Sequence, residues 1–567
     1  MKLTTACFKF FILFLIVLTS SCKEKTPKPN PALASIDLKR GELLLCSTEQ
    51  FGEVSFSLDC SYEVRETFDL AISLLHSFEY AEAEKAFVNV IDMDPECAMA
   101  YWGVTMSIYH DLWAPPSEKE LKKGLQLLKI TETLPKSEIT AQYIDAISVF
   151  YKDSENKDHN TRELLYTKKM EALYEANKDD AEATVFYALA LTSSADPNDK
   201  TYKNQKKAGA LLEKLFVENP NHPGIAHYII HTYDYPELAQ IGLSSARRYA
   251  EIAPASAHAQ HMPSHIFTRL GLWQESINTN INSTSSAICY AESVNPQANW
   301  TQEIHAVDYL VYAYLQMGDN KNAIEQMQEM KAVKTVFPKD HFASTYALTA
   351  IPVRIALENK QWREATLLDL PKLEFPWEKL SWEKAILHFG KALGYSHLKD
   401  IKSAEAELQI LQGLRQNLLD SKDNYARTYK ADQVLIQIHV ATAWIELAKG
   451  NKSEALSLMK LAAKMESETS KHPVTPGEVL PADELLGDLL LELNKPSEAL
   501  EAYEKNLVGH PNRFNGVYGA ALASKLNGNS EKATLYYKQL IDLAKHSKSN
   551  RPELLEAKAF LTKEASI

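Results

Sequence analysis

Histidine is concentrated in one part of this 567-residue chain. Seven of its 17 histidines lie between His222 and His305. Imidazole is the commonest metal ligand among side chains, and it titrates closer to neutral pH than any other. The clustering therefore indicates a candidate site for metal binding or ligand recognition.

The spacing of these histidines places several of them on common helix faces. Residues three, four or seven positions apart lie on the same side of an α-helix. Two stretches show this spacing, HAQHMPSHIF and HPGIAHYIIHTYDYP. Their members are His258, His261 and His265 in the first, and His227, His231 and Asp234 in the second. Each stretch is expected to present a row of imidazoles along one face.

The elements that must position these rows form a repeat. An amphipathic helix, a tight polar turn and a second helix beginning x-x-Ala recur along the chain, as in EYAEAEKAF, GDNKNAI, GNKSEAL and KPSEAL. From Ala499 to Ala533 the turns are 34 residues apart, the period of tetratricopeptide (TPR) repeats. We predict an all-α TPR-type solenoid of about 10–12 helical hairpins with a concave groove and ELLEAKAFL as a terminal cap. The array divides into an N-terminal part, 46–336, and a C-terminal part, 337–567.

Alignment to the TPR consensus predicts which side chains face the groove. The first helices of three consecutive hairpins direct imidazoles into it, and the first two of them carry the two histidine rows. The third of these helices carries His305 and Asp308, and Arg354 occupies a groove-facing position of a later first helix. The Arg354 guanidinium could bind a ligand carboxylate through two parallel hydrogen bonds.

These groove residues support three interpretations. A metal site would use His231, His261, His265 and His305, with Asp234 or Asp308 as a further ligand or as a partner that orients one. Imidazole ligands suit zinc or copper, and an open coordination position could activate water. Alternatively, the groove binds a peptide or a small anionic ligand, or the histidines only tie helices together. The Glu of a HExxH protease motif is absent from both rows.

The composition limits the class of protein. Apolar residues make up 45% and charged residues 24% of the chain, as in ordinary folded proteins. The formal net charge of −13 argues against nucleic acid as a partner, because phosphate contacts require a basic surface.

The N-terminus has the pattern of an export signal. Two lysines precede FFILFLIVL, an apolar run too short to span a bilayer as a mature helix. The following Thr-Ser-Ser-Cys resembles a bacterial lipobox, which predicts a signal peptide at 1–21, lipidation of Cys22 and a Pro/Lys-rich tether at 22–45. A strict lipobox has Leu where Thr19 stands. We expect a lipoprotein anchored to a membrane outside the cytoplasm, the outer membrane on its periplasmic or surface face.

Four other cysteines belong to the expected mature chain. Cys46 and Cys60 bracket a short alternating segment and are candidates for a disulfide with each other, the alternative being two buried thiols. Cys97 and Cys289 lie in helical patterns and are expected to be small core residues. The absence of CxxC argues against a thiolate zinc site.

Several longer blocks resemble one bacterial family of exported TPR proteins. They include LLHSFEYAEAEKAF, HPGIAHYIIHTYDYP, HAQHMPSHIFTRLGLW and HAVDYLVYAYLQ, and the similarity extends from Cys46 to about Gln316. The resemblance implies the TPR fold and export, and it implies no reaction.

The sequence favours a membrane-anchored binding or assembly module whose partner is a protein, a peptide or a small anionic ligand. A metal-dependent hydrolase or oxidase is the alternative from another class. Capture of a nutrient for a transporter is a third possibility.

Overall fold

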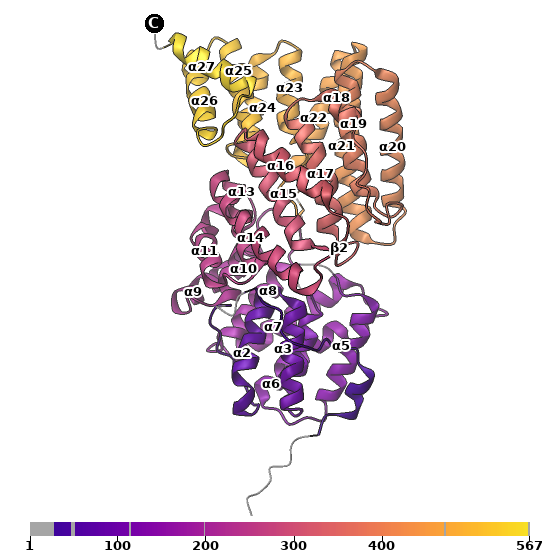
Figure 1. Ribbon diagram of the computed structural model, residues 1–567, viewed down its shortest axis with the longest axis vertical. Coiled ribbons are helices and arrows are strands. Elements are labelled where there is room, and N and C mark those ends of the chain that lie inside the picture. The colour runs from indigo at the N-terminus through magenta and orange to yellow at the C-terminus, as the bar shows by residue number, and fades with distance from the viewer. Residues whose placement is uncertain are drawn as a thin grey trace, which may run out of the picture.

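The computed structural model describes residues 28–46, 51–110, 112, 115–197, 199–469 and 472–564. The predicted signal peptide and Cys22 lie outside these residues. Within them, no helix is both long and apolar enough to cross a membrane. The chain folds as an all-α TPR-type solenoid of stacked helical hairpins (Figure 1), which confirms the predicted fold class.

The first helix of each hairpin lies on the inner side of the array and is buried on most of its faces. Short caps and turns start these helices, for example Ser256, whose hydroxyl accepts from the Ala259 N–H. The first helices are α2 (Arg65–His76), α4 (Ala98–Ser107), α6 (Glu138–Tyr151), α8 (Ala181–Ser193), α10 (Pro223–Tyr233), α12 (Ala257–His261) continued by α13 (Pro263–Leu270), α15 (Thr301–Gln316), α17 (Phe342–Glu358), α19 (Ser381–His397), α21 (Ala431–Lys449), α23 (Ala482–Glu492) and α25 (Phe514–Leu526).

The second helix of each hairpin packs antiparallel on the first and exposes its outer face. These helices are α3 (Tyr80–Met93), α5 (Glu118–Thr131), α7 (His159–Ala176), α9 (Lys203–Glu218), α11 (Ala239–Ile252), α14 (Trp273–Val294), α16 (Asn320–Ala332), α18 (Trp362–Thr366), α20 (Ile401–Leu419), α22 (Lys452–Glu468), α24 (Pro496–Gly509) and α26 (Ser530–Leu543). The number of pairs agrees with the predicted range, and α27 (Pro552–Glu564) packs on α26 as the expected cap.

Small irregular elements complete the described chain. They are the 3₁₀ turns η1 (Pro31–Ser35) and η2 (Tyr62–Val64), the π-helical turn η3 (Ala426–Lys430), and a parallel two-stranded pair, β1 (Asn299–Trp300) and β2 (Val336–Phe337). The strands join the linkers before α15 and α17, so they align two consecutive inner helices.

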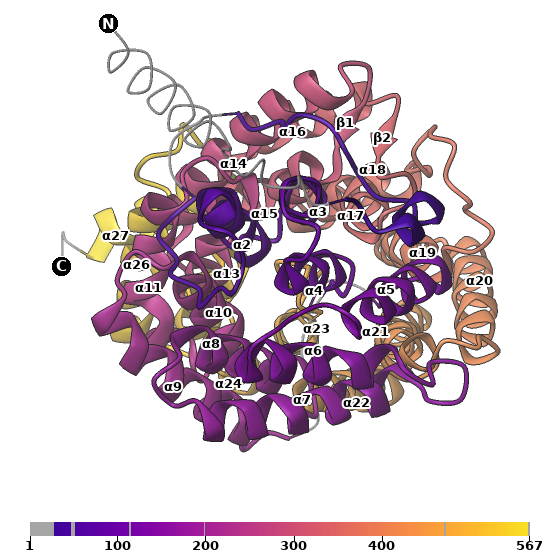
Figure 2. The ribbon, with the colours of Figure 1, turned by 90° about the horizontal axis from the view of Figure 1, so that it is seen from below.

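The superhelix curls into a ring when it is seen from below (Figure 2), and its C-terminal hairpins contact its middle. Gly271 ends α13 with a φ of +64°, which glycine adopts without strain, and an added Cβ there would lie 2.3 Å from the Pro511 oxygen. Trp273 Nε1 donates to the Asn512 oxygen at 2.7 Å, and the Phe514 N–H donates to Gln316. Hairpins far apart in the sequence are therefore mechanically linked, unlike an open solenoid in which each repeat contacts only its neighbours.

Two disulfides correct the cysteine pairing expected from the sequence. Cys46 bonds to Cys289 of α14, and Cys60 bonds to Cys97 at the start of α4. The proposed Cys46–Cys60 bridge is wrong, and Cys97 and Cys289 are not free core thiols. Both bridges fasten the N-terminal segment to helices, and these partners become neighbours only after the hairpins stack.

We expect the Cys46–Cys289 bridge to contribute more stability than the Cys60–Cys97 bridge. It closes a loop of 243 residues instead of 37. In the chain-entropy model this difference is worth roughly 1–2 kcal/mol, out of about 2–5 kcal/mol for a native bridge. Thermal melts of the two Cys→Ser double variants measure the difference. Non-reducing peptide mapping checks the pairing, and a peptide joining Cys46 to Cys60 would contradict it.

Candidate metal centre

Four consecutive segments of the inner layer carry the predicted histidines. Helix α10 supplies His227 and His231, α12 and α13 supply the row of three, and α15 supplies His305. Met262 keeps α-helical torsions between α12 and α13, so Pro263 starts a new helix without turning the row away.

The histidines lie inside the protein and not on an open groove surface. The side chains of His227, His258, His261, His265 and His305 are at most 3% exposed. His231 alone among these six is partly exposed. Stacking of the hairpins closes the inner face at this level, so the face that the helical spacing predicted is a buried interface.

The six imidazoles divide into two triads. The nitrogens of each triad lie within 4.8 Å of one another. The members are His261, His265 and His305 in one triad, and His227, His231 and His258 in the other. The proposed set His231, His261, His265 and His305 is thus distributed over two neighbouring clusters.

The hydrogen bonds of His261 and His265 determine where their protons lie. His261 Nδ1 lies 2.7 Å from Asn280 Oδ1, and the Asn280 amide nitrogen donates to the Ser276 oxygen, which fixes the orientation of that amide. His265 Nδ1 lies 3.0 Å from Asp234 Oδ2. Both Nδ1 atoms therefore donate, and in the neutral rings each Nε2 carries a lone pair.

These two Nε2 atoms face each other at 3.1 Å. Two lone pairs at this distance repel unless a proton or a metal ion lies between them. The third member, His305, has its ring centroid 4.2 Å from that of His261. Burial, followed by the nearby His261 and His265, lowers the pKa of His305 well below its ordinary value, so this ring is neutral at pH 7.

Asp234 orients His265 and is itself neutralised. Arg269 Nε donates to Asp234 Oδ1 at 2.9 Å, and a second nitrogen of the same guanidinium donates to the Asp234 backbone oxygen. A carboxylate that holds the Nδ1–H of an imidazole fixes the tautomer in which Nε2 can bind a metal. Of the two roles considered for Asp234, the structure shows this orienting contact.

Asp308 and Arg354 pair with each other. Arg354 donates to Asp308, to the Tyr346 hydroxyl at 2.9 Å and to the Gly477 oxygen at 3.0 Å, and it is fully buried. Its expected partner, a ligand carboxylate, is replaced by an internal one. The segment from His472 to Leu480 covers this pair, and the inner-helix spacing gave no signal of that segment.

A third cluster, of His76, Glu182 and His222, was not predicted from the sequence. It shows how buried imidazoles and a carboxylate satisfy their hydrogen bonds without a metal ion. Glu182 accepts from His76 Nε2 and from His222 Nε2, both at 2.9 Å. His222 Nδ1 accepts from the Ile225 N–H, and His76 Nδ1 lies 2.9 Å from the Tyr228 hydroxyl. Burial would raise the pKa of Glu182, but the two imidazoles outweigh it and lower that pKa. Every ring nitrogen has a role here, so the cluster needs no metal.

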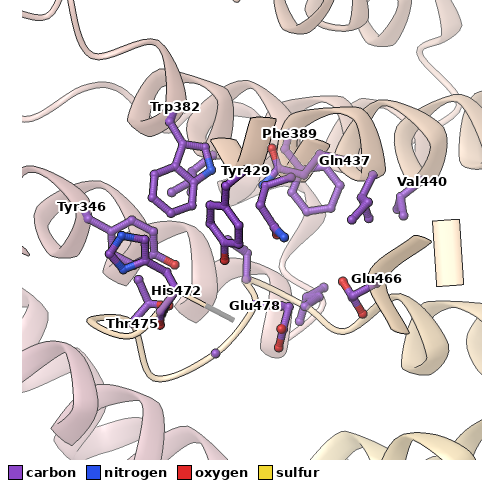
Figure 3. Close-up of a pocket in the computed structure, with 16 residues that line it drawn as sticks. Tyr346, Trp382, Phe389, Tyr429, Gln437, Val440, Glu466, His472, Thr475 and Glu478 are labelled. Atoms are coloured by element: carbon purple, nitrogen blue, oxygen red, sulfur yellow. Dashed lines mark hydrogen bonds between the residues drawn. The ribbon is translucent and has the colours of Figure 1, made fainter. Parts of the chain in front are cut away.

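A separate hollow lies in the C-terminal part of the array (Figure 3). Its cavity volume is about 40 Å³, and it lies between Trp382, Tyr429 and Tyr346 on one side and Glu466 and Glu478 on the other. Glu478 is bound to His510 at 2.9 Å. None of the predicted site histidines lines this hollow, so the open space and the histidine centre are two different features.

Comparison with known proteins finds only distant similarities to solved structures. No family model and no curated protein matches the chain. Among solved structures, a human IFIT1 dimer with m7Gppp-AAAA is 13% identical with a TM-score of 0.35, covering 86% of this chain and 96% of that one. Cut9 from the APC/C hetero-tetramer Cut9–Hcn1 is 12% identical with a TM-score of 0.30, covering 88% and 89%. The TPR domain of P58(IPK) is 12% identical with a TM-score of 0.21, covering 89% and 100%.

Proposed function

We propose that this protein is an exported, lipid-anchored TPR-type binding module that holds a transition-metal ion at His261, His265 and His305. The observation that carries the metal is the 3.1 Å contact between two Nε2 atoms whose rings both donate through Nδ1. Imidazole nitrogens of this kind are ligands for zinc and copper.

A metal ion explains this contact better than an extra proton does. The proton would create an imidazolium in a site from which water is excluded, and desolvation disfavours the charged form. Asp234 already balances Arg269, so its charge is not free to compensate. Two imidazole nitrogens bound to one tetrahedral zinc at about 2.0–2.1 Å each are about 3.4 Å apart, close to the observed spacing.

The burial of the centre favours a stabilising role for the ion. A catalytic metal needs a coordination position that substrate can reach, whereas the three ligand side chains are at most 3% exposed. The ion would tie α12 and α13 to α15 and so fix the curvature of the array. Partner binding then belongs to the surfaces of the solenoid, for which a protein or peptide is the partner class that such stacked hairpins suit.

Elemental analysis of protein purified from its native membrane tests the proposal. We expect at least one equivalent of zinc or copper per chain, retained through dialysis and lost with a strong chelator. Purification without a metal-affinity column avoids loading the site. Metal-free protein whose melting temperature is unchanged by added Zn²⁺ and Cu²⁺ would overturn the metal centre.

The lipid anchor has its own test. Cys22→Ser should release the mature protein from membranes into the soluble fraction, because the acyl chains supply the apolar attachment. Cys7→Ser is the matched control, since that cysteine lies within the predicted signal peptide. Mass spectrometry that finds an unmodified N-terminus at another residue of the membrane-bound protein would contradict this assignment.

A further inference from the structure

We infer that the centre takes a second transition-metal ion, at His227, His231 and His258, so that the protein binds two ions in adjacent all-imidazole sites. This inference rests on the proposed metal at the first triad. It assigns a separate ligand set and a stoichiometry that the first proposal does not require.

The two triads repeat one arrangement along the solenoid. Each consists of two histidines four residues apart on one inner helix and a third from the first turns of the next inner helix. The pairs are His227 with His231 and His261 with His265, and the third members are His258 and His305. Since consecutive hairpins stack in a regular way, the same positions carry histidine one hairpin later. The closest Nε2–Nε2 contact joins the two histidines of one row in the first triad, His261 and His265, and histidines of two helices in the second, His227 and His258.

The second triad also shows an oriented imidazole. His227 Nδ1 donates to the backbone oxygen of His76 at 2.6 Å, which leaves a lone pair on Nε2. That Nε2 lies 3.1 Å from His258 Nε2, the same spacing as in the first triad.

The surroundings of the second triad fit a closed site. The Phe78 ring packs against all three imidazoles, with centroid distances of 4.4 Å to His227, 5.6 Å to His231 and 5.3 Å to His258. His231 is the partly exposed member of this triad. The ring centroids of His231 and His265 are 6.2 Å apart, which places the two sites next to each other.

The chemistry of the ligands defines the class of ion. Both triads consist of imidazoles, and their nitrogens suit Zn²⁺ and copper, whereas Ca²⁺ and Mg²⁺ require oxygen ligands. We therefore expect Zn²⁺ to bind with a stoichiometry of two and Ca²⁺ not to bind at this centre.

Zn²⁺ titration of the metal-free full-length protein, followed by calorimetry and elemental analysis, tests the inference. We expect two equivalents for the wild type, one for His231→Gln, one for His305→Gln and none for the double variant. His222→Asn is the matched control: it changes a buried histidine of the cluster that needs no metal, and its side chain still caps α10. It should bind two.

Each other result has a definite meaning. One equivalent in the wild type, retained in His231→Gln and lost in His305→Gln, overturns the second site and leaves the first, with a proton on His258 satisfying the contact with His227. No binding in the wild type overturns both proposals. Loss of both ions in His231→Gln, with unchanged helicity by circular dichroism, shows one shared cluster and contradicts two separate sites. The wild-type stoichiometry decides the question even if a variant does not fold.

Discussion

His261→Ala should weaken metal binding at the first triad more than about 100-fold, because loss of a partner that only orients a ligand already costs about 10–100-fold. His305→Ala should have a similar effect, and the double variant should be little worse than either single one. Residues of one site lose most of the function at the first removal, so their effects are not additive. Competition with a chromophoric zinc chelator measures these affinities.

Thermal melts with and without a chelator distinguish histidines that bind a metal ion from histidines that only form hydrogen bonds between helices. Metal that binds only the native state stabilises it by RT ln(1 + [L]/Kd), about 4 kcal/mol at a thousand-fold excess over Kd. The chelator should therefore lower the melting temperature of the wild type and of His222→Asn, and lower that of His261→Ala by less, because only the ion at the second triad is left to remove. The opposite result is a wild-type melting temperature that the chelator does not change, with each histidine substitution lowering the free energy of unfolding by about 1–3 kcal/mol additively. The rings would then be structural hydrogen-bonding groups.

Arg513→Ala should destabilise the protein by about 3–5 kcal/mol, because it leaves buried carboxylates without their counter-ion. Arg513 is fully buried, donates two hydrogen bonds to Glu484 at 2.9 Å and one to Glu358 at 2.7 Å, and also reaches the Tyr312 hydroxyl. These contacts join α15 and α17 to α23 and α25. The variant should lose the contact between the C-terminal hairpins and the middle of the array, measured by thermal melts and by hydrogen exchange of α23–α25.

The loss in Arg513→Ala should be larger at pH 8 than at pH 5. Burial raises the pKa of Glu484 above 4.5, and the Arg513 guanidinium opposes that rise. Without the guanidinium, Glu484 in the native state keeps its proton at pH values above 4.5 where the unfolded state has lost it. The free energy of unfolding of the variant therefore falls as the pH rises above 4.5. Lys525→Ala is the control, because its ion pair with Glu556 is exposed and worth at most about 1 kcal/mol. Equal losses in the two variants would show that Arg513 does not link the array.

The hairpins could be predicted from the sequence because their determinants are local. The small residue expected after each turn is buried against its partner helix, as Ala323, Ala365, Ala455, Ala499 and Ala533 show with 0% exposure. Helical spacing likewise predicted the pairs His227 with His231 and His261 with His265. A helix fixes which side chains share a face whatever surrounds it.

Contacts between distant segments required the tertiary structure. Residues between 37 and 243 positions apart form the two disulfides, the Glu182 cluster and the pair of Arg354 with Asp308. Arg354 also bonds to the segment His472–Leu480, through the Gly477 oxygen. Helix periodicity places a residue on a face and says nothing about which other segment covers that face.

The sequence by itself determined that three inner helices bring imidazoles to one side of a solenoid. Only the tertiary structure decided that this side is buried and that the rings divide into two triads. It also decided where Nδ1 of each oriented ring donates, to Asn280, to Asp234 and to the His76 backbone. The physical reason is that the stacking of hairpins sets the distances between helices, and those distances decide which group each Nδ1 meets and whether imidazoles of neighbouring helices, such as His227 and His258, come within 3.1 Å.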